Sequence, residues 1–138
     1  MNLNRAMIIG NLTRDPEVRT TANGQTVATF GIATNHVWND ASGQRQERVE
    51  FHNIVAWGKL AEICGQYLGK GRKVYLEGRL QTREWEGQDG QKRNRTEIGP
   101  DRLHNLGHLV GDRLGYPLLE AFIDPFSPGG VIRNPLAV

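Results

Sequence analysis

One long stretch of regular alternation, residues 72–85 (RKVYLEGRLQTREW), most constrains the fold of this chain. Successive side chains of a β-strand point to opposite faces of the sheet. One face of such a strand would carry Val74, Leu76 and Leu80, which suits a hydrophobic core. The other face would carry three basic residues, Lys73, Arg79 and Arg83, and would end in Trp85, a residue that a solvent-facing surface does not need. The stretch therefore predicts a β-protein with one face suited to a flat, anionic ligand.

Several other segments have the composition of strands separated by turns. The apolar run 6–12 is followed by Asp15-Pro16, and Asn23-Gly24 favours a tight hairpin turn between 17–21 and 25–34. A polar segment containing glycine, residues 39–47, predicts a longer hairpin loop before a third strand at 48–57. The strand at 72–85 turns through 86–92 into a last strand that starts at 93–98.

One segment has helical periodicity. In residues 59–68, Leu60, Ile63, Cys64, Tyr67 and Leu68 form an apolar stripe at i, i+3, i+4, i+7 and i+8. An all-β chain with one helix between strands 3 and 4 has the element order of an OB-fold. This fold is a five-stranded Greek-key barrel.

The last part of the chain differs in composition. Five of the six prolines follow Ile98. Residues 101–107 (DRLHNLG) are a candidate end of the last strand, but Pro100 counts against it because proline cannot donate to a sheet ladder. We therefore predict an OB-fold domain at 1–107 and an atypical C-terminal tail with proline, glycine and leucine at 108–138. Residues 117–123 (PLLEAFI) are a candidate short helix. The segment before residue 99 carries 14 basic and 11 acidic residues, so the front of the chain is its basic part.

Three further aromatic residues stand out besides Trp85. Phe51 and Trp57 have the same parity on the third strand, so they would project from one face about 20 Å apart at about 3.3 Å per residue. Trp38 lies beside a polar loop. Core packing is the ordinary alternative for each aromatic. Aromatic residues between arginines and lysines instead favour stacking of bases in a cationic groove.

The sequence gives little indication of catalysis or of a bound cofactor. Gly69-Lys70-Gly71 lacks the spacing of a phosphate-binding loop, and no Ser/His/Asp arrangement or carboxylate pair stands out. His104 and His108 have a metal-ligand spacing but no third ligand near in sequence. We therefore expect no enzyme, no cofactor and no metal. The single cysteine and the short apolar run at the N-terminus predict a cytoplasmic protein.

Several motifs together resemble the bacterial single-stranded DNA-binding protein family. They are MIIGNLTRDPEVR, NGQTVATFGIATN, VEFHNIVAWGKLAEICGQYLGKGRKVYLEGRLQTREW and GQDGQKRNRTEI, which follow one another without an evident gap over about residues 3–98. The resemblance implies the OB-fold and a homotetramer. It also implies sequence-independent binding of single-stranded DNA, which coats and protects exposed strands during replication, recombination and repair.

The resemblance also assigns roles to residues. It implies base stacking by the four aromatics and basic contacts to the DNA backbone, to which the alternation adds Arg79. It places His52 and the strand from Met7 to Gly10 at a subunit interface. The implied residues are, for stacking, Trp38, Phe51, Trp57 and Trp85; for backbone contacts, Arg5, Lys59, Lys70, Arg72, Lys73, Arg79 and Arg83; and for the interface, Met7, Ile8, Ile9, Gly10 and His52.

The C-terminal end departs from the family pattern. The family usually ends in an acidic tip with Pro-Phe that recruits replication and repair proteins, whereas here Asp124-Pro125-Phe126 is internal. A frameshift, a fusion or a divergent plasmid or phage copy would each give such an end. The alternative function is an OB-fold protein-interaction module of the replication machinery that binds nucleic acid weakly. RNA is a further candidate ligand, because stacking and phosphate contacts do not exclude it.

Overall fold

The computed structural model describes residues 1–108, with side chains to residue 106. These residues form six strands and one helix: β1 (Ala6–Leu12), β2 (Glu17–Thr20), β3 (Thr26–Asn39), β4 (Arg45–Trp57), α1 (Lys59–Tyr67), β5 (Arg72–Glu86) and β6 (Lys92–His108). The predicted helix at 117–123 lies outside the described residues, and the division into a domain at 1–107 and a tail stays a prediction. None of the helical structure described is long and apolar enough to span a membrane.

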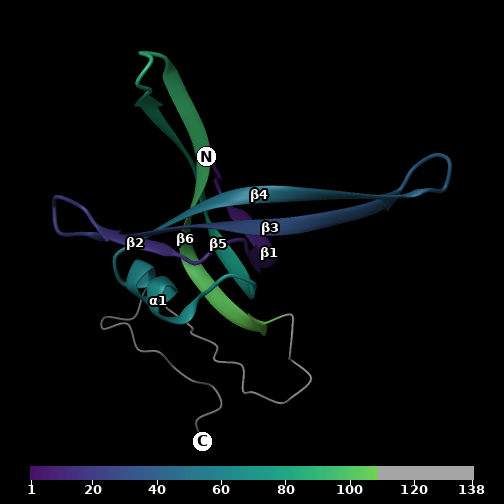
Figure 1. The fold of residues 1–138 in the computed structure, drawn as a ribbon, viewed down its shortest axis with the longest axis horizontal. Helices are drawn as coiled ribbons and strands as arrows, with labels where there is room; N and C mark the ends of the chain where they lie inside the picture. Colours follow the sequence, from purple (N-terminus) through teal and green to yellow (C-terminus); the bar gives the residue numbers. More distant parts are fainter. Residues whose placement is uncertain (109–138) are drawn as a thin grey trace, which may run out of the picture.

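Five of the strands close into a barrel (Figure 1). The sheet order is β1-β5-β6-β4-β3-β2, and a further pairing of β1 with β3 closes the ring, so that β2 extends the sheet beyond β3. Closure removes free strand edges from the barrel. β4 and β6 pair in parallel, whereas the other pairs are antiparallel. The prediction of a five-stranded OB barrel with its helix after the third barrel strand is confirmed.

The core fills the barrel and is closed by α1. Phe30 and Ile32 of β3 are fully buried with Val74 and Leu76 of β5, as the alternation at 72–85 predicted. Leu80, predicted to share that face, is instead exposed where β5 leaves the barrel for the arm. The helix contributes a buried stripe to the same cluster, made of Leu60, Ala61, Cys64 and, just past its end, Leu68. Tyr67, predicted to share that stripe, is instead exposed.

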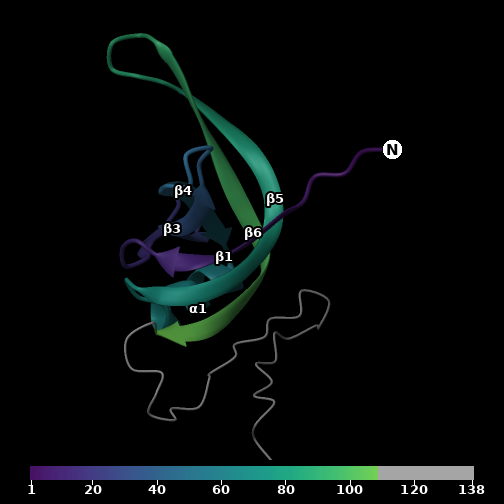
Figure 2. The same ribbon diagram turned by 90° about the vertical axis from the view of Figure 1, so that its right-hand side faces the viewer.

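Two hairpins project from the barrel as long arms (Figure 1). The β3–β4 arm is longer than predicted, because both strands continue and the loop shrinks to residues 40–44. Its tip is held by Asp40, whose Oδ1 accepts hydrogen bonds from the backbone N–H groups of Ser42 and Gln44 at 2.9 Å each. These bonds keep the pKa of Asp40 below its usual value, with the Ser42 hydroxyl as the largest cause. Figure 2 shows how strongly β5 and β6 curve before they form the second arm.

Residues 101–107 do finish the last strand, although Pro100 counted against it. β6 runs from Lys92 through Pro100 to His108, and a register shift in its pairing with β5 falls between Glu77 and Gly78. Pro100 lies opposite Gly78 at this irregularity, where a missing backbone N–H costs little. The two strands approach so closely there that a Cβ on Gly78 would lie 2.2 Å from the Gly99 carbonyl oxygen.

Candidate nucleic-acid interface

Phe51 and Trp57 of β4 share one exposed face, as their spacing predicted. The register pairs Phe51 with Ala33 and Trp57 with Val27, and the same face of β3 continues through Thr29. β2 adds Glu17 and Arg19 to this face, because they pair with Thr29 and Val27. Side chains that are cross-strand partners lie on the same side of a sheet. We call this surface the outer face.

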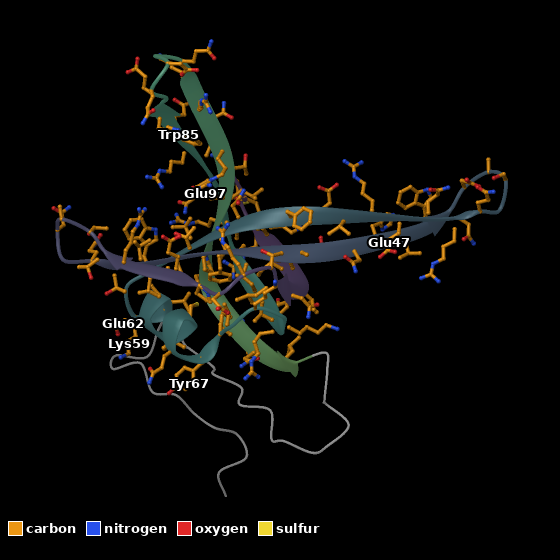
Figure 3. The ribbon with its side chains drawn as sticks, viewed as in Figure 1. Glu47, Lys59, Glu62, Tyr67, Trp85 and Glu97 are labelled. Carbon is orange, nitrogen blue, oxygen red and sulfur yellow. The ribbon has the colours of Figure 1, made fainter. Side chains whose placement is uncertain are left out.

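The β5–β6 arm continues the outer face. Asn53 of β4 pairs with Glu97 of β6, and Glu97 is in turn the partner of Gln81 on β5. Further along the arm, Arg83 pairs with Arg95 and Trp85 pairs with Arg93 on that side. Figure 3 shows Glu97 near the barrel and Trp85 toward the end of the arm. The side chains of Gln81, Arg83 and Trp85 on β5 therefore lie on the same continuous surface as Phe51 and Trp57.

All four aromatics of the predicted stacking set are solvent-exposed. Their relative exposures are 40% for Trp38, 70% for Phe51, 49% for Trp57 and 40% for Trp85. Large apolar rings with this exposure contribute little to the core, so within the described chain core packing does not account for them. Each ring has surface available for a planar ligand.

An open groove lies between the base of β2 and the β5–β6 arm. It has a volume of about 430 Å³ and is lined by Arg14, Glu17, Arg19, Thr29, Arg83, Trp85 and Arg95. Four guanidinium groups and one indole against one carboxylate make a cationic groove with an aromatic wall. Arg14, Arg19 and Arg95 were missed by the sequence analysis, although Arg14 and Arg19 flank the motif DPEV that it quoted.

Arg95 forms an ion pair with a nearly buried carboxylate on the same face of the sheet. Its Nη2 donates to Glu97 Oε1 at 3.0 Å, and Glu97 is only 4% exposed. Its guanidinium carbon lies 5.9 Å from the centre of the Trp85 ring, within the range of a cation–π contact. Arg95 thus steadies the indole while leaving the groove positive.

Trp38 is separated from the other three aromatics by the strand parity. It pairs with Gln46 on the face of the β3–β4 arm opposite to that of Phe51. The indole stacks on the His36 ring with centroids 5.3 Å apart and an interplanar angle of 22°. The structure therefore brings together three of the predicted stacking residues and places the fourth on the other side of the arm.

The predicted cations fall into separate groups. Arg83 lines the groove, and Arg79 is exposed on the same strand. Lys59 is exposed on α1, where its Nζ lies 3.4 Å from Glu62 Oε2, on the helix side of the barrel (Figure 3). The remaining ones, Lys70, Arg72 and Lys73, lie at or just before the start of β5, at the opposite end of the strand from Trp85.

Arg5 differs from the other predicted cations because two carboxylates neutralise it. Its guanidinium forms a bidentate pair with Asp101, at 2.5 Å and 2.9 Å, and a further bond of 2.5 Å to Glu77. These bonds raise the pKa of Arg5, with Asp101 as the largest cause. The Tyr75 hydroxyl also donates to Glu77, and this bond is the main reason that the pKa of Glu77 is lowered.

The predicted interface residues alternate between surface and core. Met7 and Ile9 of β1 are exposed, at 65% and 53%, whereas Ile8 packs against the core and Gly10 is buried. His52 is half-buried, and its Nε2 is 2.8 Å from the Thr34 hydroxyl. Within the described residues, no group of three His, Cys, Asp or Glu side chains is placed to hold a metal ion.

Comparison with known proteins gives consistent matches. Residues 3–106 match the single-strand binding protein family. The chain is 48% identical over 122 residues to the single-stranded DNA-binding protein of a serogroup A strain of Neisseria meningitidis, covering 88% of this chain and 70% of that protein. It is 56% identical over 106 residues to single-stranded DNA-binding protein 1 of Chlorobaculum tepidum, covering 76% of this chain and 65% of that protein.

Solved structures give the same match for the fold. The Plasmodium falciparum single-strand binding protein, in complex with single-stranded DNA, superposes with a TM-score of 0.72 at 33% identity, over 77% of this chain and 97% of that one. A deletion mutant of the single-stranded DNA-binding protein from Thermus aquaticus gives a TM-score of 0.67 at 34% identity, over 75% of this chain and 50% of that one.

Proposed function

The chain belongs to the single-strand binding protein family, and from that premise we propose that it binds single-stranded DNA without sequence preference, as a non-enzymatic protein. Bases would stack on Phe51, Trp57 and Trp85 while the arginines of the groove neutralise phosphates. Coating of exposed strands in this way would protect them during replication, recombination and repair.

The observation that carries this proposal is the outer face itself. Three exposed rings and four arginines lie on it or beside it, on strands that are distant in sequence. Base edges are not read by stacking, because every base has a π-face. The surface therefore suits a flexible single strand, whose bases are free to stack, better than a duplex, whose bases are already stacked.

The test is a titration of tryptophan fluorescence with oligo(dT), run beside a duplex of equal length at low and high salt. All three tryptophans are exposed, so contact with bases should quench their emission. We expect quenching by the single strand that weakens with salt, and little quenching by the duplex. Absence of quenching by either DNA would favour the protein-interaction module instead. Oligo(rU) in the same titration measures how far RNA competes.

The assembly belongs to the proposal as well. The exposed pair Met7 and Ile9 gives β1 an apolar outer surface, which supports the implied homotetramer. Light scattering of the purified protein measures the oligomeric state, and Met7→Lys with Ile9→Lys should shift it toward smaller species. We further propose a cytoplasmic location on DNA. Replication and repair proteins are further proposed partners, and Asp124-Pro125-Phe126, which departs from the family's usual acidic tip, lies outside the described residues.

A further inference from the structure

Glu17 is the carboxylate that lines the cationic groove, and among the described residues it has no hydrogen-bond or ion-pair partner. Glu17 and Arg19 project from the same side of β2, since they pair with Thr29 and Val27. Among the described side chains Glu17 forms no ion pair and no hydrogen bond, although it lines a groove with four arginines. A negative group in a phosphate-binding groove weakens binding, so its presence calls for an explanation.

We propose that Glu17 acts as an internal counter-charge, a carboxylate that offsets the positive charge of the groove arginines. It stabilises the free protein by reducing the repulsion among these arginines, and it speeds dissociation of bound DNA by repelling the phosphates. The inference rests on the proposed function, because it assumes that the groove takes phosphates. In the free protein the guanidinium groups of the groove repel one another, most directly Arg83 and Arg95, which are cross-strand partners. Glu97 offsets part of the charge of Arg95, so the remaining repulsion is greatest at Arg83, Arg14 and Arg19. Glu17 attracts all four and lowers that repulsion.

A bound phosphate reverses the sign of this contribution. The phosphate then supplies the negative charge that the arginines need, and Glu17 repels it. Glu17 thus favours the empty groove and disfavours the occupied one, and both effects lower the affinity. A protein that coats exposed strands must also leave them, and a lower affinity is achieved mostly through faster dissociation.

This role differs measurably from a structural one. A carboxylate that only positioned an arginine would, when removed, reduce both the stability of the free protein and its affinity for DNA. An internal counter-charge, when removed, should reduce the stability of the free protein but increase its affinity. The opposite signs of the two effects identify the mechanism.

Glu17→Gln removes the charge and nearly keeps the shape, and Glu84→Gln is the matched control. Glu84 is exposed on the β5–β6 arm, pairs with Asn94, and by parity lies on the opposite face from Arg83 and Trp85. Both variants change the net charge of the protein by the same amount. Their comparison therefore separates the local effect from that of overall charge.

The experiment measures oligo(dT) affinity and dissociation rate at low and high salt, and the melting temperature with and without DNA. For Glu17→Gln we expect about three- to tenfold tighter binding at low salt, mostly through slower dissociation, as one nearby charge in a partly solvated groove would give. The gain should shrink at high salt. The melting temperature should be lower than that of the wild type without DNA and should rise more when DNA is added.

Two results would overturn the proposal. Equal affinities of Glu17→Gln and Glu84→Gln would show that the Glu17 carboxylate has no local effect on binding. Weaker binding by Glu17→Gln than by the wild type would show that Glu17 positions an arginine instead. Both results would leave the proposed function intact, since the wild type would still bind. If the wild type itself does not bind oligo(dT), the proposed function fails first and this inference fails with it.

Discussion

At the scale of single residues, the β5–β6 arm contains an arrangement that stability alone would not favour. Arg83 and Arg95 face each other across the two strands, and like charges directly opposite destabilise a sheet. Part of the charge of Arg95 is taken up by the nearly buried Glu97 and by the Trp85 ring. Arg83 has no ion pair among the described side chains. A local cost with no structural gain is typical of a functional surface.

Trp57 should contribute to binding without contributing much to stability. Its ring is about half exposed, so Trp57→Ala should weaken oligo(dT) binding by about 1–3 kcal/mol, the usual value for loss of one stacking ring. The melting temperature should change little. Trp57→Phe retains a π-face and is the control that should keep most of the affinity. Unchanged binding by Trp57→Ala, measured by anisotropy of labelled oligo(dT), would remove this residue from the site.

Glu77 should make stability depend on pH in the acid range. Hydrogen bonds from Tyr75 and Arg5 lower its pKa in the folded protein below the ordinary value of 4.5. A lowered folded-state pKa gives a stabilising contribution that is present above the unfolded pKa and is lost as pH falls through the folded one. The loss should therefore occur below pH 4.5.

Glu77→Gln tests this assignment, because the amide does not titrate. The variant should be less stable at neutral pH, and its free energy of unfolding should fall less steeply below pH 4.5 than that of the wild type. Urea unfolding at a series of pH values measures both quantities. Parallel curves for the two proteins would mean that the hydrogen bonds from Tyr75 and Arg5 do not hold Glu77 in its charged form.

At the scale of elements, the sequence predicted the strands and the helix well but the ends of the arms poorly. The alternation at 72–85 and the stripe at 59–68 identify most of the buried side chains, because burial on one face leaves a pattern in the local sequence. Leu80 and Tyr67, at the ends of these patterns, are exposed. The β3–β4 arm extends through polar residues that no core covers, so the sequence there looks like a loop. Its tip depends on hydrogen bonds to Asp40 rather than on hydrophobic pattern.

At Pro100, a correct local rule counted against a strand that does form. Proline does break a regular ladder, but β5 and β6 shift register at this point and the strand continues to His108. The close approach of Gly78 and Gly99 makes this possible, and it depends on two residues about 20 positions apart in sequence. A contact of this kind has no signature within a sequence window.

Gly78→Ala should therefore be costly. The added methyl group would lie 2.2 Å from the Gly99 carbonyl oxygen, a backbone atom that cannot rotate away. We expect a loss of about 1–3 kcal/mol in the free energy of unfolding, as for overpacking of a tight site. Gly69→Ala is the control, because its nearest atom, at 3.4 Å, is a side-chain oxygen of Asp15. A Gly78→Ala protein as stable as the control would show that β5 and β6 can move apart at the register shift.

At the scale of the whole molecule, the candidate site was predictable in kind but only partly in position. The sequence identified the four aromatics and a basic strand, and the family resemblance identified the function. Which cations share a surface depends on the closure of the barrel. That closure brings Arg14 and Arg19, from the start of the chain, to Arg83 and Trp85. It also pairs Arg5 with Asp101, 96 residues away in sequence, and so neutralises a predicted phosphate contact.

This geometry makes the role of each cation depend on the length of the bound strand. Lys73 and Arg83 lie ten residues apart on β5, about 33 Å along the strand at about 3.3 Å per residue. An oligo(dT) of about 4 nucleotides, at the lower end of OB-fold site sizes, can fill the groove but cannot contact Lys73 and Arg83 at the same time. One several times longer can follow the surface from Trp85 toward the start of β5.

Arg83→Ala should therefore weaken binding of both the short and the long oligonucleotide, whereas Lys73→Ala should weaken binding of the long one alone. For each lost phosphate contact, the slope of log K against log salt should fall by about 0.7, the value for single strands. Salt titrations of the two variants with both oligonucleotides give four slopes. If Lys73→Ala also lowers the slope for the short strand, the short strand binds near the start of β5 and the groove is not its first site. If Lys73→Ala changes neither slope, the long oligonucleotide does not extend to the start of β5 and Lys73 is not a backbone contact.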